Sequence, residues 1–410
     1  MPSPENFKVS VYAIALNEER FIRRWYDCFK EADEICVLDT GSTDKTVDIL
    51  RSLGAKVSVM RFDRWKTLEE LDALTAAGKN PWRFDKARNE AMKLCSPDST
   101  LLFCTDVDDV IEPGWKSRLE AIWRKGVEEG RKVGHLPNSV LYTYAVVYNQ
   151  GADEQLQVFH RHNIHTPKGW HWQNRCHEVL ESDGEPKNFV HAPEFRMESR
   201  PEAKDHSSYL WLLEADAREE SKDGRIFHIL AREYMQLGRN DEAIEMFQRH
   251  LSCKKADWNC ERAASMKFMS DCYARKGDGV QQELWLWRAM IEDPLDRDAS
   301  YTLGRILVKR KDYKLAQKVL LHCLKIEKPS GEFPFFSLDA WTERPYLSLV
   351  EAYFYDGKWP EALEVATTAL LKFPKSAMAA KTVEEVKNHL AKGDANKVTE
   401  IPRFRIEIDN

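Results

Sequence analysis

The sequence predicts two folded parts, an α/β domain built on a largely parallel sheet and an all-α domain after it. The first observation is that short β-branched runs alternate with longer helical patterns over residues 7–140, which is typical of strands joined by crossover helices. The second is that strand patterns disappear after about residue 205. The third is the length of 410 residues, which is enough for about two to four domains with cores of their own.

The elements of the α/β domain follow one another in a regular order. Expected strands are rich in β-branched and apolar residues, and expected helices carry apolar residues three and four positions apart. The expected strands are residues 8–16, 34–40, 55–61 and 100–106, and the expected helices are residues 18–30, 43–53, 84–94 and 115–131. Two longer strands rich in Tyr and Val, 139–149 and 155–161, would extend the sheet in an antiparallel direction.

The second half of the chain repeats a pattern of small and large residues at intervals of about 34 residues. Small residues let the two helices of a pair approach closely, and large residues fill the groove between successive pairs. This pattern is typical of tetratricopeptide repeats, which stack on one another because no pair buries its apolar face alone. The clearest copies contain Ala231, Tyr234, Gly238, Ala243 and Phe247, and Tyr353, Gly357, Ala362, Ala369 and Pro374.

The domain limits follow from these patterns. We expect the α/β domain over residues 1–204, the helical repeats over 205–391 and a tail over 392–410. A helix at 207–221 would cap the start of the repeats and a helix at 377–391 would cap their end.

Composition and charge exclude several classes of protein. Apolar residues make up 43% and charged residues 31% of the chain, which is a globular and not a disordered profile. The formal net charge of −6 provides no bulk attraction to nucleic acid or anionic lipid. No stretch reaches the roughly 18 apolar residues of a membrane-spanning helix, the opening MPSPENFK lacks a signal-peptide pattern, and the nine cysteines form no Cys-x-x-Cys pair. We therefore expect a cytoplasmic protein with reduced thiols and no membrane span.

Acidic and polar residues collect where the predicted parallel strands end, and an open α/β sheet places its ligand crevice at this edge. The strongest signal is the group Asp106, Asp108 and Asp109 after the strand at 100–106. Carboxylates two residues apart on an extended segment point the same way and supply the oxygen ligands that Mg²⁺ or Mn²⁺ prefers. The alternative is a solvated turn or a helix cap before Pro113.

Four motifs in a fixed order resemble the family 2 glycosyltransferases with the GT-A fold, a Rossmann-like nucleotide-diphospho-sugar transferase fold. They are ALNEE at 15–19, LDTGSTDKT at 38–46, KARNEAM at 86–92 and TDVDD at 105–109, and the resemblance covers residues 8–195. A subgroup of this family also carries tetratricopeptide repeats after the catalytic domain. The resemblance implies an inverting glycosyltransferase that uses Mn²⁺ or Mg²⁺ and a UDP- or GDP-linked sugar.

The resemblance also implies a set of donor-binding residues. Asn17 and Glu18 match a loop that lies against the nucleotide base and ribose, and Asp39 matches a carboxylate that hydrogen-bonds the base. Arg88 and Asn89 match a helix that faces the donor, and Asp106 and Asp108 match the Asp-x-Asp metal motif, with Asp106 also contacting the donor. The structural alternatives are a solvated turn for Asn17 and Glu18, helix capping for Asp39 and a surface ion pair for Arg88.

On the acceptor side the resemblance points to the segment 168–178. Glu178 would be the catalytic base, and His191 would complete the metal shell. Trp170 and Trp172 would share a face of an extended segment and stack on a sugar ring, or they would be core aromatics beneath the site. A solvated Glu178 and a satisfied His191 are the corresponding alternatives.

The sequence departs from the family pattern at an insertion, 63–82, which would be a lid or an acceptor loop. The acceptor would be a saccharide, a lipid-linked saccharide or a protein, and the acidic balance argues mildly against a modified nucleic-acid base. The repeats would grip the acceptor, a partner subunit or a second copy of the chain. The rival hypotheses are a repeat scaffold with a relic nucleotide-binding domain, and a nucleotidyltransferase, which needs a glycine-rich basic loop where this chain has Asn17 and Glu18.

Overall fold

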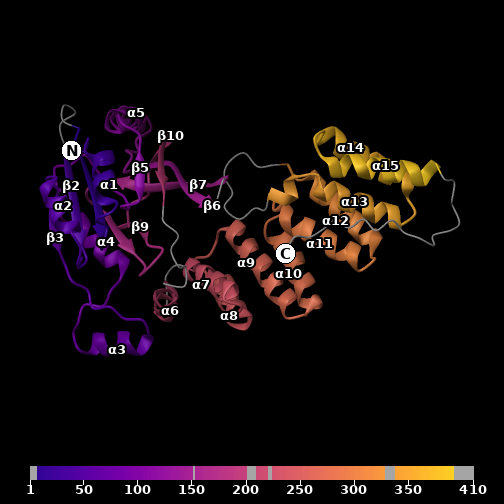
Figure 1. Cartoon of the computed structure of the whole chain (residues 1–410), viewed down its shortest axis with the longest axis horizontal. Helices are drawn as coiled ribbons and strands as arrows, with labels where there is room; N and C mark the ends of the chain where they lie inside the picture. The colour runs from indigo at the N-terminus through magenta and orange to yellow at the C-terminus, as the bar shows by residue number, and fades with distance from the viewer. Residues whose placement is uncertain (1–6, 151–152, 201–208, 220–223, 328–337, 392–410) are drawn as a thin grey trace. The chain divides into compact units, whose positions relative to one another are not determined.

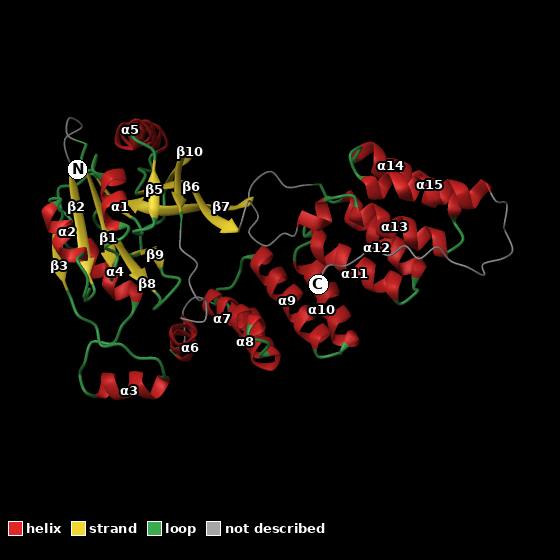
Figure 2. Cartoon of the chain, viewed as in Figure 1, coloured by secondary structure: helices red, strands yellow, loops and turns green. Residues whose placement is uncertain are grey.

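The computed structural model describes residues 7–150, 153–200, 209–219, 224–327 and 338–391 (Figure 1). The chain divides into two compact units, Met1–Glu220 and Ser221–Asn410, and each is described by itself. A mixed sheet with helices forms the first unit, and helices form the described part of the second (Figure 2), as the sequence predicts. The expected tail 392–410 lies outside the described residues.

An eight-stranded sheet forms the centre of the first unit, in the order β3-β2-β1-β4-β7-β6-β10-β5. The first four of these strands are parallel, and β7 runs antiparallel to both β4 and β6, which is the expected antiparallel extension. A separate two-stranded sheet pairs β8 with β9. The strands are β1 Val9–Ala15, β2 Glu34–Asp39, β3 Lys56–Val59, β4 Leu101–Cys104, β5 Asp109–Ile111, β6 Ser139–Gln150, β7 Asp153–His165, β8 Trp170–Gln173, β9 Val179–Ser182 and β10 Phe189–Ser199.

The helices of the first unit are α1 Ile22–Phe29, α2 Thr46–Ser52, α3 Leu68–Ala76, α4 Phe84–Met92, α5 Trp115–Val133 and α6 Leu210–Arg218. An aromatic core joins α1 and α5 to β4, where the rings of Phe29 and Trp115 each lie 5.8 Å from the ring of Phe103. The buried Trp25 indole N–H donates to the Thr105 hydroxyl at 3.1 Å. This bond ties the core to the start of the acidic segment.

The insertion 63–82 contains the helix α3. Its neck is closed by backbone hydrogen bonds from Asp63 N to Asn80 O at 2.8 Å and from Trp82 N to Asp63 O at 3.0 Å. Thr67 caps the helix by accepting from Glu70 N at 3.2 Å. A threonine followed three residues later by a glutamate is a typical start of a helix. The insertion is therefore an ordered helical excursion from the sheet.

The second unit is a succession of packed helices, each against the next. Gly238, Gly277 and Gly357 follow the first helix of three pairs with φ of +74°, +77° and +78°, a conformation that favours glycine. In the degenerate third copy Lys311 takes the same left-handed turn with φ of +68°. The helices are α7 Arg225–Gln236, α8 Asn240–Ser252, α9 Asn259–Arg275, α10 Gly279–Glu292, α11 Arg297–Lys309, α12 Tyr313–Lys325, α13 Arg344–Tyr355, α14 Trp359–Lys372 and α15 Ala377–Ala391, with a 3₁₀ turn at Leu338–Trp341.

The close approach of paired helices depends on small residues, as the repeat pattern predicts. A Cβ on Gly304 of α11 would lie 2.4 Å from Leu320 Cδ2 of α12, which is too close for any side chain. Ala231, Ala243, Ala316 and Ala362 are fully buried at the related positions. Among the described residues, no helix combines the length and the apolar character needed to cross a membrane.

One expected element lies in a different unit from the one predicted. The helix expected at 207–221 as a cap of the repeats is α6, and it belongs to the first compact unit. Its side chains contact α3 and the segment between β8 and β9, so the division between the units falls after Glu220 and not after residue 204.

Candidate functional site

Three carboxylates lie together where β4 ends. One oxygen from each of Asp106, Asp108 and Asp109 lies within 4.8 Å of the others. The turn is held by its own backbone, since Asp106 N donates to Asp109 Oδ2 at 2.8 Å and Asp109 N donates to Asp106 O at 3.0 Å. Hard oxygen atoms at this spacing fit a Mg²⁺ or Mn²⁺ ion.

Asp109 is the buried member of this group. Its side chain has no exposed surface, and its Oδ1 accepts from the Tyr144 hydroxyl at 2.7 Å. Burial raises the pKa of Asp109 well above its ordinary value, the charge of Asp106 raises it further, and the nearby Arg161 opposes both effects. Crowded carboxylates of this kind are stabilised by an added cation.

Arg88 of α4 joins the acidic group to the expected catalytic base. Its Nη2 donates to Asp106 Oδ1 at 2.7 Å and its Nε donates to Glu178 Oε1. Its Nη1 lies 3.1 Å from the Cys104 sulfur. Burial acts to lower the pKa of Arg88, but the charges of Asp106 and Glu178 raise it well above the usual value, so the guanidinium is firmly charged. The structure therefore brings Arg88, Asp106 and Glu178 into one chain of contacts.

Asn89 fixes the strand β8 against α4. Its side-chain nitrogen donates to Trp172 O at 2.8 Å, and its side-chain oxygen accepts from Trp172 N at 2.9 Å. The amide thus takes the place of a neighbouring strand. The sequence analysis expects Asn89 to face the donor, and the contacts that the structure shows are to protein backbone.

Trp170 and Trp172 share a face of β8, as their spacing predicts, and they are 5% and 4% exposed. The Arg88 guanidinium lies 5.2 Å from the Trp172 ring. The Trp172 indole N–H donates to the Tyr12 hydroxyl at 2.8 Å, and that hydroxyl lies 3.0 Å from His165 Nε2. The Trp172 indole thus has the contacts of a core aromatic, which is the structural alternative of the sequence analysis, whereas Trp170 also lines the cleft described below.

The loops after β1 and β2 are tied to each other. Asn17 Oδ1 accepts from Thr43 N at 2.8 Å, and Glu18 N donates to Thr46 Oγ1 at 2.8 Å. Asn17 itself is exposed and has φ of +55°. Asp39 is fully buried, and its Oδ1 accepts from Gly41 N at 3.0 Å and Ser42 N at 2.9 Å. The Asp39 carboxylate therefore holds the turn at Gly41 and Ser42 that follows β2.

His191 is not brought to the acidic group. It lies on β10 opposite Leu141 of β6, whereas Ser199, which pairs with Asp109, lies opposite Val146. These two positions are five residues apart along β6, a distance of roughly 17 Å. The register of the long strand β10 is the physical reason for this separation. The third acidic side chain near Asp106 and Asp108 is Asp109.

Sequence reasoning missed Arg161 as a member of the site. Its Nη1 lies 3.6 Å from Asp106 Oδ2, and its guanidinium lies 3.7 Å from the Tyr144 ring. Arg161 comes from β7 and Tyr144 from β6, so their meeting depends on the pairing of two strands. No local pattern fixes that register before the structure is known.

A cleft of about 700 Å³ lies beside the site. Its walls come from the insertion, from the outward side of α4, from β8 and from the end of the first unit. Aromatic and aliphatic groups mix with charged side chains around it. The lining includes Leu71, Thr75, Trp82, Lys86, Asn89, Glu90, Lys93, Trp170, His171 and Arg175.

Comparison with known proteins gives a family for part of each unit. Residues 10–129 match the model of the family described as glycosyl transferase family 2. Residues 226–257 and 298–329 each match a model described as tetratricopeptide repeat. The matched segments follow the same order along the chain as the α/β and helical units.

One curated relative is an uncharacterized glycosyltransferase from Rickettsia bellii (strain RML369-C), which is 51% identical over 53 residues. The match covers 13% of this chain and 18% of the relative, so the chain spans less than a fifth of that protein's length. Among solved structures, the MamA protein is 16% identical with a TM-score of 0.32, covering 48% of this chain and 88% of MamA. YrrB, a TPR protein with an unusual peptide-binding site, is 15% identical with a TM-score of 0.34, covering 44% of this chain and 83% of YrrB.

Proposed function

Because residues 10–129 form a family 2 glycosyltransferase domain and tetratricopeptide repeats follow it, we propose that the chain is an inverting, metal-dependent glycosyltransferase. It would move a sugar from a UDP- or GDP-linked donor to an acceptor hydroxyl. The observation that carries this proposal is the chain of contacts from Asp106 through Arg88 to Glu178 at the end of β4. In this chain one guanidinium joins the acidic group to the carboxylate that is proposed as the base.

Asp106, Asp108 and Asp109 would hold Mn²⁺ or Mg²⁺, since their oxygens already lie within 4.8 Å of one another. Such an ion stabilises the negative charge that develops on the departing nucleoside diphosphate. Arg88 keeps the Asp106 carboxylate in a fixed orientation through the 2.7 Å bond to Oδ1. Fixed ligands lower the cost of reorganisation during the reaction. The expected part of His191 in this shell is not proposed, given its distance along β10.

Glu178 would act as the base. Its side chain is only 10% exposed, and Arg88 Nε donates to its Oε1, which holds the carboxylate in a fixed orientation at the site. The acceptor oxygen would form a bond to the anomeric carbon while its proton passes to Glu178. The bond from that carbon to the phosphate oxygen would break on the opposite face, and the nucleoside diphosphate would leave with the bonding electrons.

The donor would lie along the loops after β1 and β2. Asn17 and Glu18 are proposed to contact the base and ribose, and Asp39 is proposed to support this contact from within its turn. Asn89, Trp170 and Trp172 would form the floor of the site. The hydrogen bonds of Asn89 to β8 and the burial of both indoles support this placement.

The cleft beside α4 is proposed to admit the acceptor, with the insertion 63–82 as one wall. The repeats would bind the acceptor or a partner subunit, a second copy of the chain among them. All nine cysteines are free thiols, which supports action in a reducing compartment such as the cytoplasm.

The test is the release of nucleoside diphosphate from a panel of UDP- and GDP-linked sugars, with Mn²⁺, with Mg²⁺ and with EDTA. Asp108→Asn should lower turnover by roughly 100-fold, because a ligand of the charge-stabilising ion is lost, and its melting temperature should stay close to the parent value. The control is Asp98→Asn, a 59% exposed carboxylate that pairs with Lys8.

Two results would contradict the proposal. Full turnover of the Asp108→Asn chain in EDTA would remove the metal assignment. UDP and GDP that bind equally weakly with and without Mn²⁺ in calorimetry would favour the rival, a repeat scaffold with an inactive first domain.

A further inference from the structure

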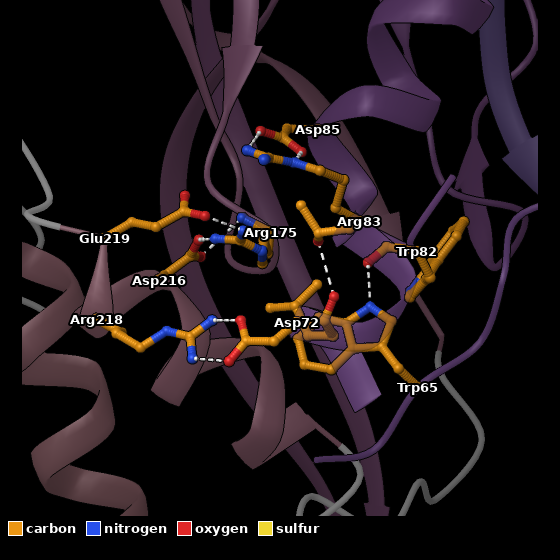
Figure 3. Close-up of polar contacts among 11 residues, drawn as sticks. Trp65, Asp72, Trp82, Arg83, Asp85, Arg175, Asp216, Arg218 and Glu219 are labelled. Carbon is orange, nitrogen blue, oxygen red and sulfur yellow. Dashed lines mark hydrogen bonds and ion pairs between the residues drawn. The ribbon is translucent and has the colours of Figure 1, made fainter. Parts of the chain in front are cut away.

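The helix α6 is anchored to the first unit by two separate groups of polar contacts, both visible in Figure 3. In one group, Arg175 faces Asp216 and Glu219 (Figure 3). In the other, Arg218 faces Asp72 of α3 in a two-pronged ion pair, with bonds of 2.9 and 2.7 Å. The first group joins α6 to the segment between β8 and β9, and the second joins α6 to α3.

The contact between Arg175 and Asp216 is buried. The two side chains are 5% and 8% exposed, whereas Arg218 and Asp72 are 41% and 62% exposed. Asp216 accepts twice from the same residue, from the Arg175 backbone N at 2.7 Å and from Arg175 Nη1 at 3.0 Å. A buried carboxylate that holds both the main chain and the side chain of one arginine fixes that residue in position and in orientation.

Arg175 sits in the short segment 174–178 that connects β8 to β9 and ends in Glu178. Asn174 and His177 have φ of +79° and +48°, a region that residues other than glycine rarely adopt. Such conformations persist only where surrounding contacts determine them. These contacts include Asp216 on one side and α4 on the other, where Phe84 N donates to Arg175 O at 2.9 Å.

The same segment delivers the candidate base. Three residues after Arg175, the Glu178 carboxylate pairs with Arg88, which in turn pairs with Asp106. The segment is therefore held at Arg175 by α6 and reaches the site at Glu178. α6 ends at Arg218, and the first helix of the repeats begins at Arg225.

We propose that Asp216 and Arg175 are positioning residues for Glu178, an inference that rests on the proposed role of Glu178 as base. Asp216 holds Arg175, and Arg175 holds the segment 174–178 in the conformation that presents the Glu178 carboxylate to Arg88. The helix that precedes the repeats is in this way part of the support of the catalytic site.

The test compares Asp216→Asn with the control Asp72→Asn, which removes the partner of Arg218 in the second group of contacts and changes no contact of the 174–178 segment. Asp216→Asn should lower kcat by about 100-fold, since a base displaced by about 1 Å costs this much, with the donor KM changed less than about twofold. Asp72→Asn should leave kcat within about twofold of the parent. A drop of the same size in both variants would overturn the inference.

A second measurement separates positioning from general destabilisation. In the Glu178→Gln background, Asp216→Asn should produce no further loss of kcat, because residues that act through one group are not additive. Losses that multiply in the double variant would show that Asp216 acts elsewhere. If Asp216→Asn fails to fold, Arg175→Lys takes its place, because lysine keeps the positive charge but lacks the guanidinium that donates to Asp216 and Glu219. This variant should show the same loss of kcat with little change in the donor KM.

Hydrogen exchange gives a readout that does not depend on activity. Peptides that cover residues 174–178 should exchange faster in Asp216→Asn than in the parent chain, with unchanged exchange in Asp72→Asn. Exchange that is unaltered in this segment would overturn the inference. A parent chain without transferase activity would instead contradict the proposed function, and the exchange result would still decide the anchoring of the segment.

Discussion

At the scale of single residues, a buried chain of hydrogen bonds runs from Trp172 through Tyr12 to His165. The order of donors and acceptors along this chain determines which nitrogen of His165 carries the proton. The Trp172 indole can only donate, so the Tyr12 oxygen accepts from it at 2.8 Å and the Tyr12 hydroxyl donates to His165 Nε2 at 3.0 Å. His165 Nδ1 then carries the proton and donates to Thr166 O at 2.8 Å. Every member is satisfied only while His165 is neutral.

This chain predicts a dependence of stability on pH. Burial lowers the pKa of His165 to about 4, against about 6.5 in an unfolded chain. The unfolded state therefore binds a proton more readily than the folded state between these two pH values. The contribution of His165 to the free energy of unfolding is complete above pH 6.5 and is lost as the pH falls to about 4. The loss amounts to about 3 kcal/mol.

The measurement is the melting temperature of the parent chain and of His165→Gln between pH 7.5 and 4.5. The glutamine variant lacks the titrating group, so its melting temperature should fall less steeply over this range. Parallel curves for the two chains would contradict the prediction. The comparison cancels the other buried histidines, such as His228, whose pKa burial also lowers.

At the scale of elements, the local patterns of the sequence were sufficient for most strands and helices. The strand at 100–106, the helix at 84–94 and the repeat glycines are confirmed because short-range periodicity and turn chemistry determine them. The acidic group after β4 is confirmed as a cluster for the same reason, since its members are adjacent in the chain.

Features that depend on contacts between distant segments could not be predicted in this way. The distance of His191 from the acidic group depends on the register of β10, and the place of Arg161 depends on the pairing of β6 with β7. The hydrogen bonds of Asn89 to β8 join residues 83 positions apart. Neither periodicity nor motif spacing contains this information.

The insertion offers a prediction at the same scale. Thr75 of α3 is exposed and lines the cleft that is proposed to admit the acceptor. Thr75→Trp should fill part of this space and raise the acceptor KM by about tenfold or more, with hydrolysis of the donor in the absence of acceptor unchanged. The measurement is steady-state kinetics with acceptor and donor varied in turn.

The matched control is Ala76→Trp, the neighbouring exposed position on α3, which is not among the residues that line the cleft. It should leave both constants close to those of the parent. Equal effects of the two tryptophans, or no effect of Thr75→Trp, would remove the cleft from the path of the acceptor.

At the scale of the whole molecule, the position of α6 decides where the chain can be divided. The Trp211 ring lies 4.2 Å from the Trp65 ring, and Asp216 binds the buried Arg175. A shortened chain of residues 1–220 keeps these contacts. A chain of residues 1–204 lacks α6 and therefore exposes the side chains of Trp65 and Arg175. The compact unit that ends at Glu220 therefore contains both partners of each of these contacts.

This difference predicts distinct stabilities for the two shortened chains. Residues 1–204 should melt roughly 10 °C below residues 1–220, because the deletion removes the buried Arg175–Asp216 pair and the packing of Trp211 on Trp65, a loss of about 3–5 kcal/mol. Differential scanning calorimetry measures the two melting temperatures, and the calorimetric binding of UDP with Mn²⁺ gives an independent check on the longer chain. Equal melting temperatures would contradict the assignment of α6 to the first unit.

The paired hydrogen bonds between Asn89 and Trp172 have a consequence for chemical ageing. An amide can serve both the carbonyl and the N–H of one strand residue, but a carboxylate only accepts. Spontaneous deamidation at Asn89 would set an anionic oxygen against the Trp172 carbonyl and loosen β8 from α4. The lifetime of the packing between β8 and α4 would then depend on the slow hydrolysis of one side chain.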